Sequence, residues 1–172
     1  MDTYTSLARK AVVEYLLNYR LLKPPPNLPK EMLSRRAGVF VSLHHKNGSL
    51  RGCIGTYLPT QKNLAEEIIK NALSAAFRDP RFPPVTLEEI PSLVFSVDIL
   101  SKPKPVPLNF PLNPKIYGLI VSSTDGRSGL LLPDIEGVDT PEDQIRICKM
   151  KAGIWQDEAV TFQIFTVTRH EE

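Results

Sequence analysis

The segment from residue 38 to residue 57 reads Gly38-Val39-Phe40-Val41-Ser42-Leu43-His44-His45-Lys46-Asn47-Gly48-Ser49-Leu50-Arg51-Gly52-Cys53-Ile54-Gly55-Thr56-Tyr57. Two runs rich in apolar and β-branched residues flank Asn47-Gly48, a dipeptide that tolerates the positive φ angles of a type I′ turn. The segment therefore predicts a β-hairpin. The register of that hairpin decides which side chains share a face.

A two-residue loop at Asn47-Gly48 fixes the expected register. The expected pairs are His45 with Leu50, His44 with Arg51, Leu43 with Gly52, Ser42 with Cys53, and Val41 with Ile54. Opposed residues share a face, so one face is a core face that carries Val39, Val41, Leu43, Leu50, Gly52 and Ile54. The other face carries a thiol and a guanidinium side by side, among Phe40, Ser42, His44, Arg51, Cys53 and Gly55.

The hexapeptide Leu50-Arg51-Gly52-Cys53-Ile54-Gly55 resembles the signature of the AMMECR family, named for the chromosomal region of Alport syndrome, midface hypoplasia, intellectual disability and elliptocytosis. Further matches follow in the same order along the chain: Gly38-Val39-Phe40-Val41, Arg78-Asp79-Pro80-Arg81-Phe82-Pro83-Pro84, Gly129-Leu130-Leu131-Leu132-Pro133 and Lys151-Ala152-Gly153. The resemblance implies a two-lobed fold with the hexapeptide near a cleft. Prokaryotic members, of the AmmeMemoRadiSam system protein A type, are often encoded beside Memo-like and radical-SAM-type proteins, which implies a shared pathway.

Length and composition limit the class of protein. A chain of 172 residues fits one domain or two small lobes. Cys53 and Cys148 have no CxxC spacing, so reduced thiols are expected. No signal-peptide pattern and no membrane-length apolar run occurs, so we expect a cytoplasmic protein without a membrane partner. The net charge of +2 is spread along the chain, and nucleic acid is not an expected partner.

The remaining pattern predicts an α+β fold, with antiparallel β-hairpins and flanking helices. Apolar spacing and capping residues predict helices over 5–21, 61–77 with Thr60 as N-cap, and 140–152. Strands are expected over 93–100 and 160–168, with a second hairpin over 117–133 and a proline-rich connection over 102–114. We expect one AMMECR-type domain over 1–172. Its main lobe comes from both chain ends, and a smaller lobe forms around 38–60 and 102–135.

Cys53 is the candidate nucleophile. A cysteine reacts as the thiolate, and a nearby cation such as Arg51 lowers the pKa of a thiol. His44 could accept the proton, which would give the Cys/His pairing used in nucleophilic catalysis. The alternatives are that Cys53 is a small apolar filler of the strand and that His44 is a solvated residue near the hairpin end.

The segment after the second predicted helix supplies the candidate substrate-binding residues Arg78, Asp79, Arg81 and Phe82, as the second wall of a cleft. Arg78 and Asp79 could instead cap the helix and pair with each other. Glycine destabilises a strand interior, so Gly52 and Gly55 indicate room for a ligand, a backbone kink, or close packing of a helix. The sequence shows no metal-ligand spacing and no nucleotide-binding loop, so neither a metal nor another cofactor is expected.

Two functions fit these residues. The first is a cleft-based enzyme, or a component of a modification system, that binds an anionic or carbonyl-bearing small-molecule or protein substrate with Arg51 and Arg78 and attacks or holds it with Cys53. The second is a non-catalytic binding or scaffold module that recognises a partner protein or a small acid through the same cleft. The sequence leaves open whether the chain is an enzyme.

Overall fold

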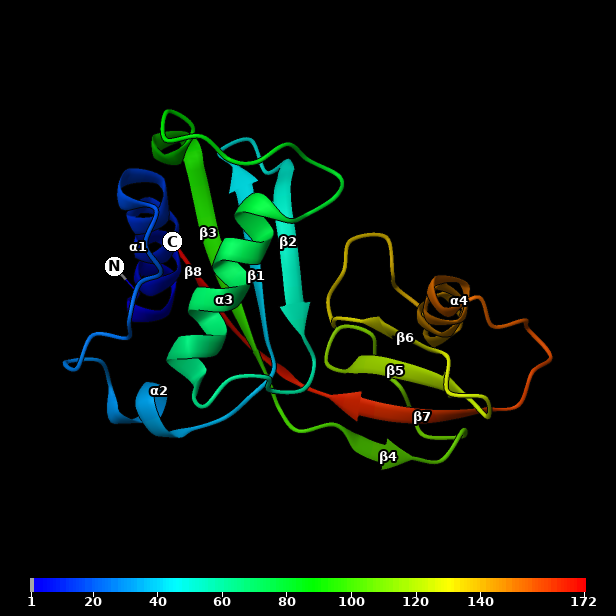
Figure 1. The fold of residues 1–172 in the computed structure, drawn as a ribbon. Helices are drawn as coiled ribbons and strands as arrows, with labels where there is room; N and C mark the ends of the chain where they lie inside the picture. The colour runs from blue at the N-terminus through cyan, green and yellow to red at the C-terminus, as the bar shows by residue number, and fades with distance from the viewer. Residues whose placement is uncertain (1) are drawn as a thin grey trace. The chain divides into compact units, whose positions relative to one another are not determined.

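The structure is a computed structural model that describes residues 2–172 (Figure 1). It confirms the α+β class, with helices beside two antiparallel four-stranded sheets. The helices are α1 (Thr3–Asn18), α2 (Lys30–Ser34), α3 (Leu64–Phe77) and α4 (Pro141–Ala152), with a 3-10 helix η1 (Ile90–Ser92). The strands are β1 (Val39–His45), β2 (Leu50–Thr56), β3 (Leu93–Leu100), β4 (Lys104–Val106), β5 (Gly118–Ser123), β6 (Ser128–Leu131), β7 (Val160–Phe165) and β8 (Val167–Glu171).

The chain divides into two compact units. Unit 1 contains residues 1–100 and 168–172, and unit 2 contains residues 101–167. The hairpin of β1 and β2 belongs to unit 1, whereas the hairpin of β5 and β6 belongs to unit 2. The expected grouping of 38–60 with 102–135 therefore differs from this division, because β1 pairs with β3 of unit 1 on its other side.

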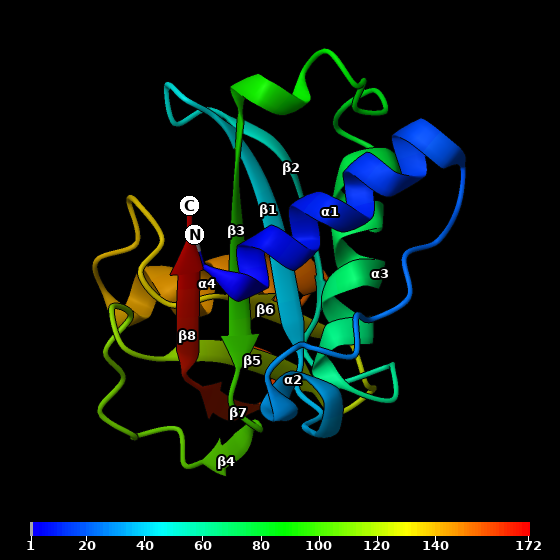
Figure 2. The ribbon, with the colours of Figure 1, turned by 90° about the vertical axis from the view of Figure 1, so that its left-hand side faces the viewer.

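Unit 1 is a sheet covered by helices on one face. The strand order is β2-β1-β3-β8. Figures 1 and 2 show α1 and α3 on the same side of this sheet. Alternate residues of β1 and β3 point to that side and are buried: Val39, Val41, Leu43, Leu93, Phe95, Val97 and Ile99. The remaining residues of β1, which include Phe40, Ser42 and His44, point to the opposite face, and we call this the outer face of sheet 1.

The turn of the first hairpin differs from the expected type I′ turn. Gly48 has a positive φ of 86°, whereas the φ angle of Asn47 is not positive. Gly48 N–H donates to the His45 carbonyl at 2.8 Å, and His45 N–H donates to the Ser49 carbonyl at 2.9 Å. These bonds define a type I turn over Lys46 and Asn47 followed by one left-handed glycine, a common hairpin loop. His45 therefore faces Ser49 and not Leu50.

A β-bulge at Arg51 restores the predicted register beyond the turn. His44 pairs with Leu50, so the predicted pair of His44 with Arg51 is wrong. Leu43 pairs with Gly52, as predicted, because Arg51 is the extra residue of β2. The predicted pairs of Ser42 with Cys53 and of Val41 with Ile54 are confirmed as well. The longer loop shifts the pairing by one residue, and the bulge removes that shift.

Two helix boundaries in unit 1 also differ from expectation. Helix α1 ends at Asn18 because Tyr19 adopts the left-handed conformation, with a φ of 52°. Helix α3 has Asn63 as its N-cap and not Thr60, since the Asn63 side chain accepts from the Glu66 N–H at 2.9 Å. Thr60 instead donates its N–H and hydroxyl to the buried carboxylate of Glu67.

Unit 2 is a second sheet, with strand order β4-β7-β5-β6 and a core that includes Cys148 of α4. The predicted helix boundaries are confirmed here, with Thr140 as N-cap and Gly153 as left-handed C-cap. The proline-rich connection contains one short strand, β4, which the sequence did not predict. Pro105 is tolerated in it because β4 is an edge strand. No helix of residues 2–172 is long and apolar enough to cross a membrane.

Candidate functional site

Cys53 lies on the outer face of sheet 1 and is half-buried. Its Sγ accepts a hydrogen bond from the Ser42 hydroxyl of β1 at 3.1 Å. Burial raises the pKa of the Cys53 thiol above its ordinary value of 9.0, and the Ser42 hydrogen bond and the charge of Arg81 offset this only in part. The negative charges of Asp98 and Asp79 raise the pKa further. The surroundings of Cys53 therefore favour the thiol over the thiolate.

The backbone of Cys53 is clamped by the segment that follows α3. Its N–H donates to Asp79 Oδ2 at 2.9 Å, and its carbonyl accepts from Arg81 Nη2 at 3.3 Å. Asp79 in turn accepts from Arg81 Nε at 2.9 Å and Nη2 at 2.7 Å. Because β2 is an edge strand, these two side chains satisfy groups that a further strand would otherwise bind. Asp79 thus pairs with Arg81 and not with Arg78, the partner considered from sequence.

Asp79→Asn is expected to destabilise the protein by about 2 kcal/mol at pH 7, since it removes charged hydrogen bonds to Cys53 and Arg81. The Arg81 guanidinium holds the pKa of the Asp79 carboxyl well below its ordinary value of 3.8. A depressed folded-state pKa gives stability that is present above the unfolded pKa and is lost as pH falls through the folded one. The difference between wild type and variant should therefore shrink below about pH 4 in urea unfolding followed by circular dichroism. Asp157→Asn is the exposed control, and a difference that is constant down to pH 2 would contradict the assignment.

Arg51 forms an ion pair with Glu89. Its Nε donates to Glu89 Oε1 at 2.8 Å and its Nη2 donates to Oε2 at 3.1 Å. The residue is only 6% exposed, and its Nη1 is buried without a hydrogen-bond partner in residues 2–172. The positive charge that lowers the pKa of the Cys53 thiol is that of Arg81 and not that of Arg51. The bulge helps to explain this, because a bulge redirects the side chain it carries.

Phe82 connects the two arginines. The guanidinium carbons of Arg51 and Arg81 lie 5.9 Å and 5.6 Å from the centre of its ring, within the range of cation–π attraction. The structure therefore brings Arg51, Cys53, Asp79, Arg81 and Phe82 into one cluster around β2.

The two glycines of the hexapeptide are explained by close packing within unit 1. A Cβ on Gly52 would lie 2.3 Å from the backbone oxygen of Ala75 in α3. A Cβ on Gly55 would lie 2.2 Å from Cγ of Phe40, whose ring covers this glycine. The packing alternative considered from sequence accounts for Gly52, and a neighbouring aromatic ring accounts for Gly55.

Two predicted site residues lie apart from this cluster. His44 is half-buried opposite Leu50 and Val94, and its imidazole makes no hydrogen bond within residues 2–172. Arg78 is the C-cap of α3 and lines a groove with Tyr15 and Phe77. The structure therefore does not bring Arg78 together with Arg51.

The outer face continues across β3 and β8. Ser96 pairs with Ser42, and Asp98 pairs with Phe40. Asp98 is buried and accepts two hydrogen bonds from Arg169, at 2.8 Å and 3.1 Å, in an ion pair. The face around Cys53 thus presents hydroxyls, a thiol and paired charges. Among residues 2–172 no cluster of three or more His, Cys, Asp or Glu side chains is arranged to hold a metal ion.

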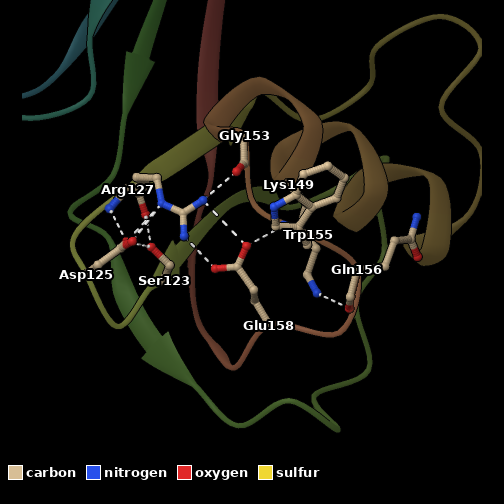
Figure 3. A network of polar contacts seen from close by, with 8 residues as sticks. All are labelled: Ser123, Asp125, Arg127, Lys149, Gly153, Trp155, Gln156 and Glu158. Carbon is tan, nitrogen blue, oxygen red and sulfur yellow. Dashed lines mark hydrogen bonds and ion pairs between the residues drawn. The ribbon is translucent and has the colours of Figure 1, made fainter.

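Unit 2 contains a separate polar network (Figure 3). Arg127 binds the carboxylates of Asp125 and Glu158 and the carbonyl of Gly153. Glu158 also accepts the N–H of Trp155 at 2.6 Å, while Trp155 itself is 77% exposed. The network fixes the loop between α4 and β7 and presents the indole ring to solvent.

Sequence reasoning missed Glu89 as part of the candidate site. The signal was available in Thr86 and Glu89, which are spaced as a capping box in which the acid reaches back to the N–H of the capping residue. That bond is present at 2.8 Å from Thr86 N–H to Glu89 Oε2. The capping role places the Glu89 carboxylate where Arg51 reaches it.

These features define a two-unit α+β protein in which an edge strand carries a cysteine whose backbone is bound by Asp79 and Arg81. The AMMECR1 family model matches residues 5–170, and the chain belongs to this family. A Thermotoga maritima protein is 52% identical over 170 residues, which cover 98% of this chain and 97% of the relative. Protein CA_C1420 of Clostridium acetobutylicum is 46% identical over 99% of this chain, which spans only 36% of that relative.

A solved structure supports the fold assignment. The crystal structure of uncharacterized protein PH0010 from Pyrococcus horikoshii superimposes with a TM-score of 0.89 at 37% sequence identity. The match covers 98% of this chain and 89% of that protein. Sequence and fold therefore agree on the family.

Proposed function

We propose that the chain is a non-catalytic recognition module whose outer face of sheet 1, around Cys53, binds a carboxylate-bearing ligand. The observation that carries the proposal is the state of Cys53. Burial raises the pKa of its thiol, and its backbone N–H and carbonyl are both occupied by Asp79 and Arg81. A nucleophilic cysteine needs a depressed pKa or an adjacent base.

Arg81 is the expected contact for the ligand. Its side chain is 55% exposed, and its Nη1 makes no hydrogen bond within residues 2–172. The other nitrogens are fixed by Asp79 and by the Cys53 carbonyl, so the guanidinium is held next to β2, where its charge acts on the Cys53 thiol. A guanidinium pre-organised in this way suits a carboxylate.

The competing function is the thiol enzyme, in which Cys53 attacks an anionic or carbonyl-bearing substrate. It is favoured by the partial exposure of Cys53 and by the positive charge of Arg81 nearby. That mechanism requires a proton acceptor for the thiol, and His44 makes no hydrogen bond to it. The link to Memo-like and radical-SAM-type proteins, and a cleft at Cys53, are further predictions of the family resemblance.

Alkylation by iodoacetamide distinguishes the two functions. We expect Cys53 to react more slowly at pH 7 than an unperturbed thiol and to gain reactivity as the pH rises, because its folded-state pKa is raised. Burial raises the pKa of the Cys148 thiol to about 12, so labelling below that pH reports Cys53. Labelling sites are read by mass spectrometry, with Cys53→Ser as control. Rapid alkylation of Cys53 at pH 6 to 7 would support the thiol-enzyme function and contradict the proposed non-catalytic recognition module.

Ligand binding is tested with the same variants. In a thermal-shift panel of small mono- and dicarboxylic acids, wild type and Cys53→Ser should respond equally. Arg81→Lys should lose the response, since lysine lacks the planar fork but keeps the charge. A response that Cys53→Ser abolishes, or that Arg81→Lys retains, would contradict the proposal.

A further inference from the structure

Unit 1 contains a groove that is distinct from the Cys53 cluster. It lies between the end of α1 with the segment after it and one side of α3, and its volume is about 910 Å³. One wall is formed by Tyr15 and residues 21–24, and the other by residues of α3 with Gln61 and Arg78. The groove is therefore built entirely from residues of a single compact unit.

The inside of the groove is apolar. Leu22, Leu73 and Phe77 line it and also pack against the core of unit 1. The ring of Tyr15 lies 5.1 Å from Phe77 and 6.2 Å from Tyr19, centre to centre, so an aromatic row runs outward from the groove. Tyr19 is 83% exposed and Leu21 is 70% exposed. The apolar surface thus extends beyond the cavity, onto the exposed side chain of Tyr19.

The rim carries excess positive charge on both walls. Lys23 lies on one wall and Lys70 and Arg78 lie on the other, against the single carboxylate of Glu66. Lys23 and Arg78 are exposed and have no side-chain hydrogen bond or ion pair within residues 2–172.

We propose that this groove docks an acidic amphipathic segment of a partner protein. Aliphatic or aromatic side chains of the segment fill the space between Leu73, Phe77 and Leu21, as in other helix-in-groove complexes. Acidic residues on both sides of that apolar stripe pair with Lys23 on one wall and with Lys70 and Arg78 on the other. This surface is independent of the one proposed for the carboxylate ligand.

The test is selection from a random 16-residue peptide-display library on the immobilised protein. We expect enriched peptides with apolar residues at i, i+3 or i+4 and a net negative charge, bound with an affinity that falls as salt rises. By fluorescence anisotropy, Leu21→Asp should weaken the best peptide at least about tenfold, as for a hot-spot residue. Lys23→Glu and Lys70→Glu should each weaken it several-fold. All three positions are exposed, so the fold should be kept.

Matched controls separate this proposal from the one at Cys53. Lys10→Glu makes the same charge change on the exposed surface of α1 outside the groove and should leave binding unchanged. Arg81→Lys should also leave it unchanged. No enrichment, enriched peptides without acidic residues, or equal binding to the groove variants would overturn the proposal. Binding of sodium laurate in the groove without any peptide binding would likewise overturn it, in favour of a lipid site.

Discussion

Gly52→Ala is expected to destabilise the folded protein by about 3 kcal/mol or more, the upper range for overpacking a close contact. The added Cβ would lie 2.3 Å from the backbone oxygen of Ala75. A backbone atom cannot rotate away, so either α3 or β2 has to move. Because β2 also carries Cys53, the same change should disturb the Asp79 contact at 2.9 Å. Urea unfolding followed by far-UV circular dichroism measures the loss.

Two further variants test the cause. In Gly55→Ala the three atoms nearest to the new Cβ all belong to the ring of Phe40, a side chain that can rotate, so a smaller loss of about 1 kcal/mol is expected. Adding Ala75→Gly to Gly52→Ala should give no rescue, because the clash is with the main chain and a helical glycine lowers stability further. Rescue by Ala75→Gly, or equal losses at Gly52 and Gly55, would show that another contact is responsible.

Glu67→Ala is expected to destabilise the protein by about 4 kcal/mol, because it removes several hydrogen bonds to a buried charged acceptor, each worth about 1.5–3 kcal/mol at most. The Glu67 carboxylate is fully buried and accepts from Thr56 Oγ1 at 2.6 Å, from the N–H and hydroxyl of Thr60 at 2.7 and 2.9 Å, and from Gln61 N–H at 2.7 Å. Removing it leaves these partly buried donors without their acceptor. Thermal unfolding by circular dichroism measures the effect.

The neighbouring acid provides the control. Glu66→Ala removes a carboxylate one residue earlier in α3 that lines the groove. A change within about 0.5 kcal/mol is expected there. Glu67→Gln should lie between the two, since the amide keeps one oxygen but turns an N–H₂ group toward backbone donors. Equal stability of Glu66→Ala and Glu67→Ala would refute the role given to the Glu67 network.

Much of the fold was predictable because apolar patterning at period two specifies strand faces. The alternation of Val39, Val41 and Leu43 predicted which face of β1 is buried. The pairs Ser42–Cys53 and Val41–Ile54 were predicted from a two-residue loop, and they hold because the bulge offsets the longer loop. The caps Thr140 and Gly153 likewise set both ends of α4. In each case a local signal agreed with the tertiary packing.

The errors arose where one local signal permits two structures. Asn47-Gly48 suits a type I′ turn, but it equally suits a type I turn followed by a left-handed glycine, which lengthens the loop by one residue. The core face then requires an extra residue in β2, and the bulge falls at Arg51. A buried acid such as Glu67 was also unpredictable, since its partners Thr56 and Thr60 come together only when α3 packs on the sheet.

Only part of the candidate site was predicted, because closeness in sequence is also a local signal that permits two structures. Sequence proximity joined Arg78 to Asp79, yet the end of α3 separates them, so that Asp79 contacts β2 while Arg78 lines the groove. The prolines near Asp79 and Arg81 predict a rigid segment. They do not reveal that two side chains of this segment bind the backbone of β2 at its free edge.

The solvent-exposed indole of Trp155 has a practical consequence for spectroscopy. It is the chain's single tryptophan, and its ring is surrounded largely by water before any unfolding takes place. Its fluorescence therefore reports on the surface loop that Glu158 and Arg127 hold together, and hardly at all on the packing of α1 and α3. A tryptophan introduced into the core of unit 1 would supply the missing optical signal.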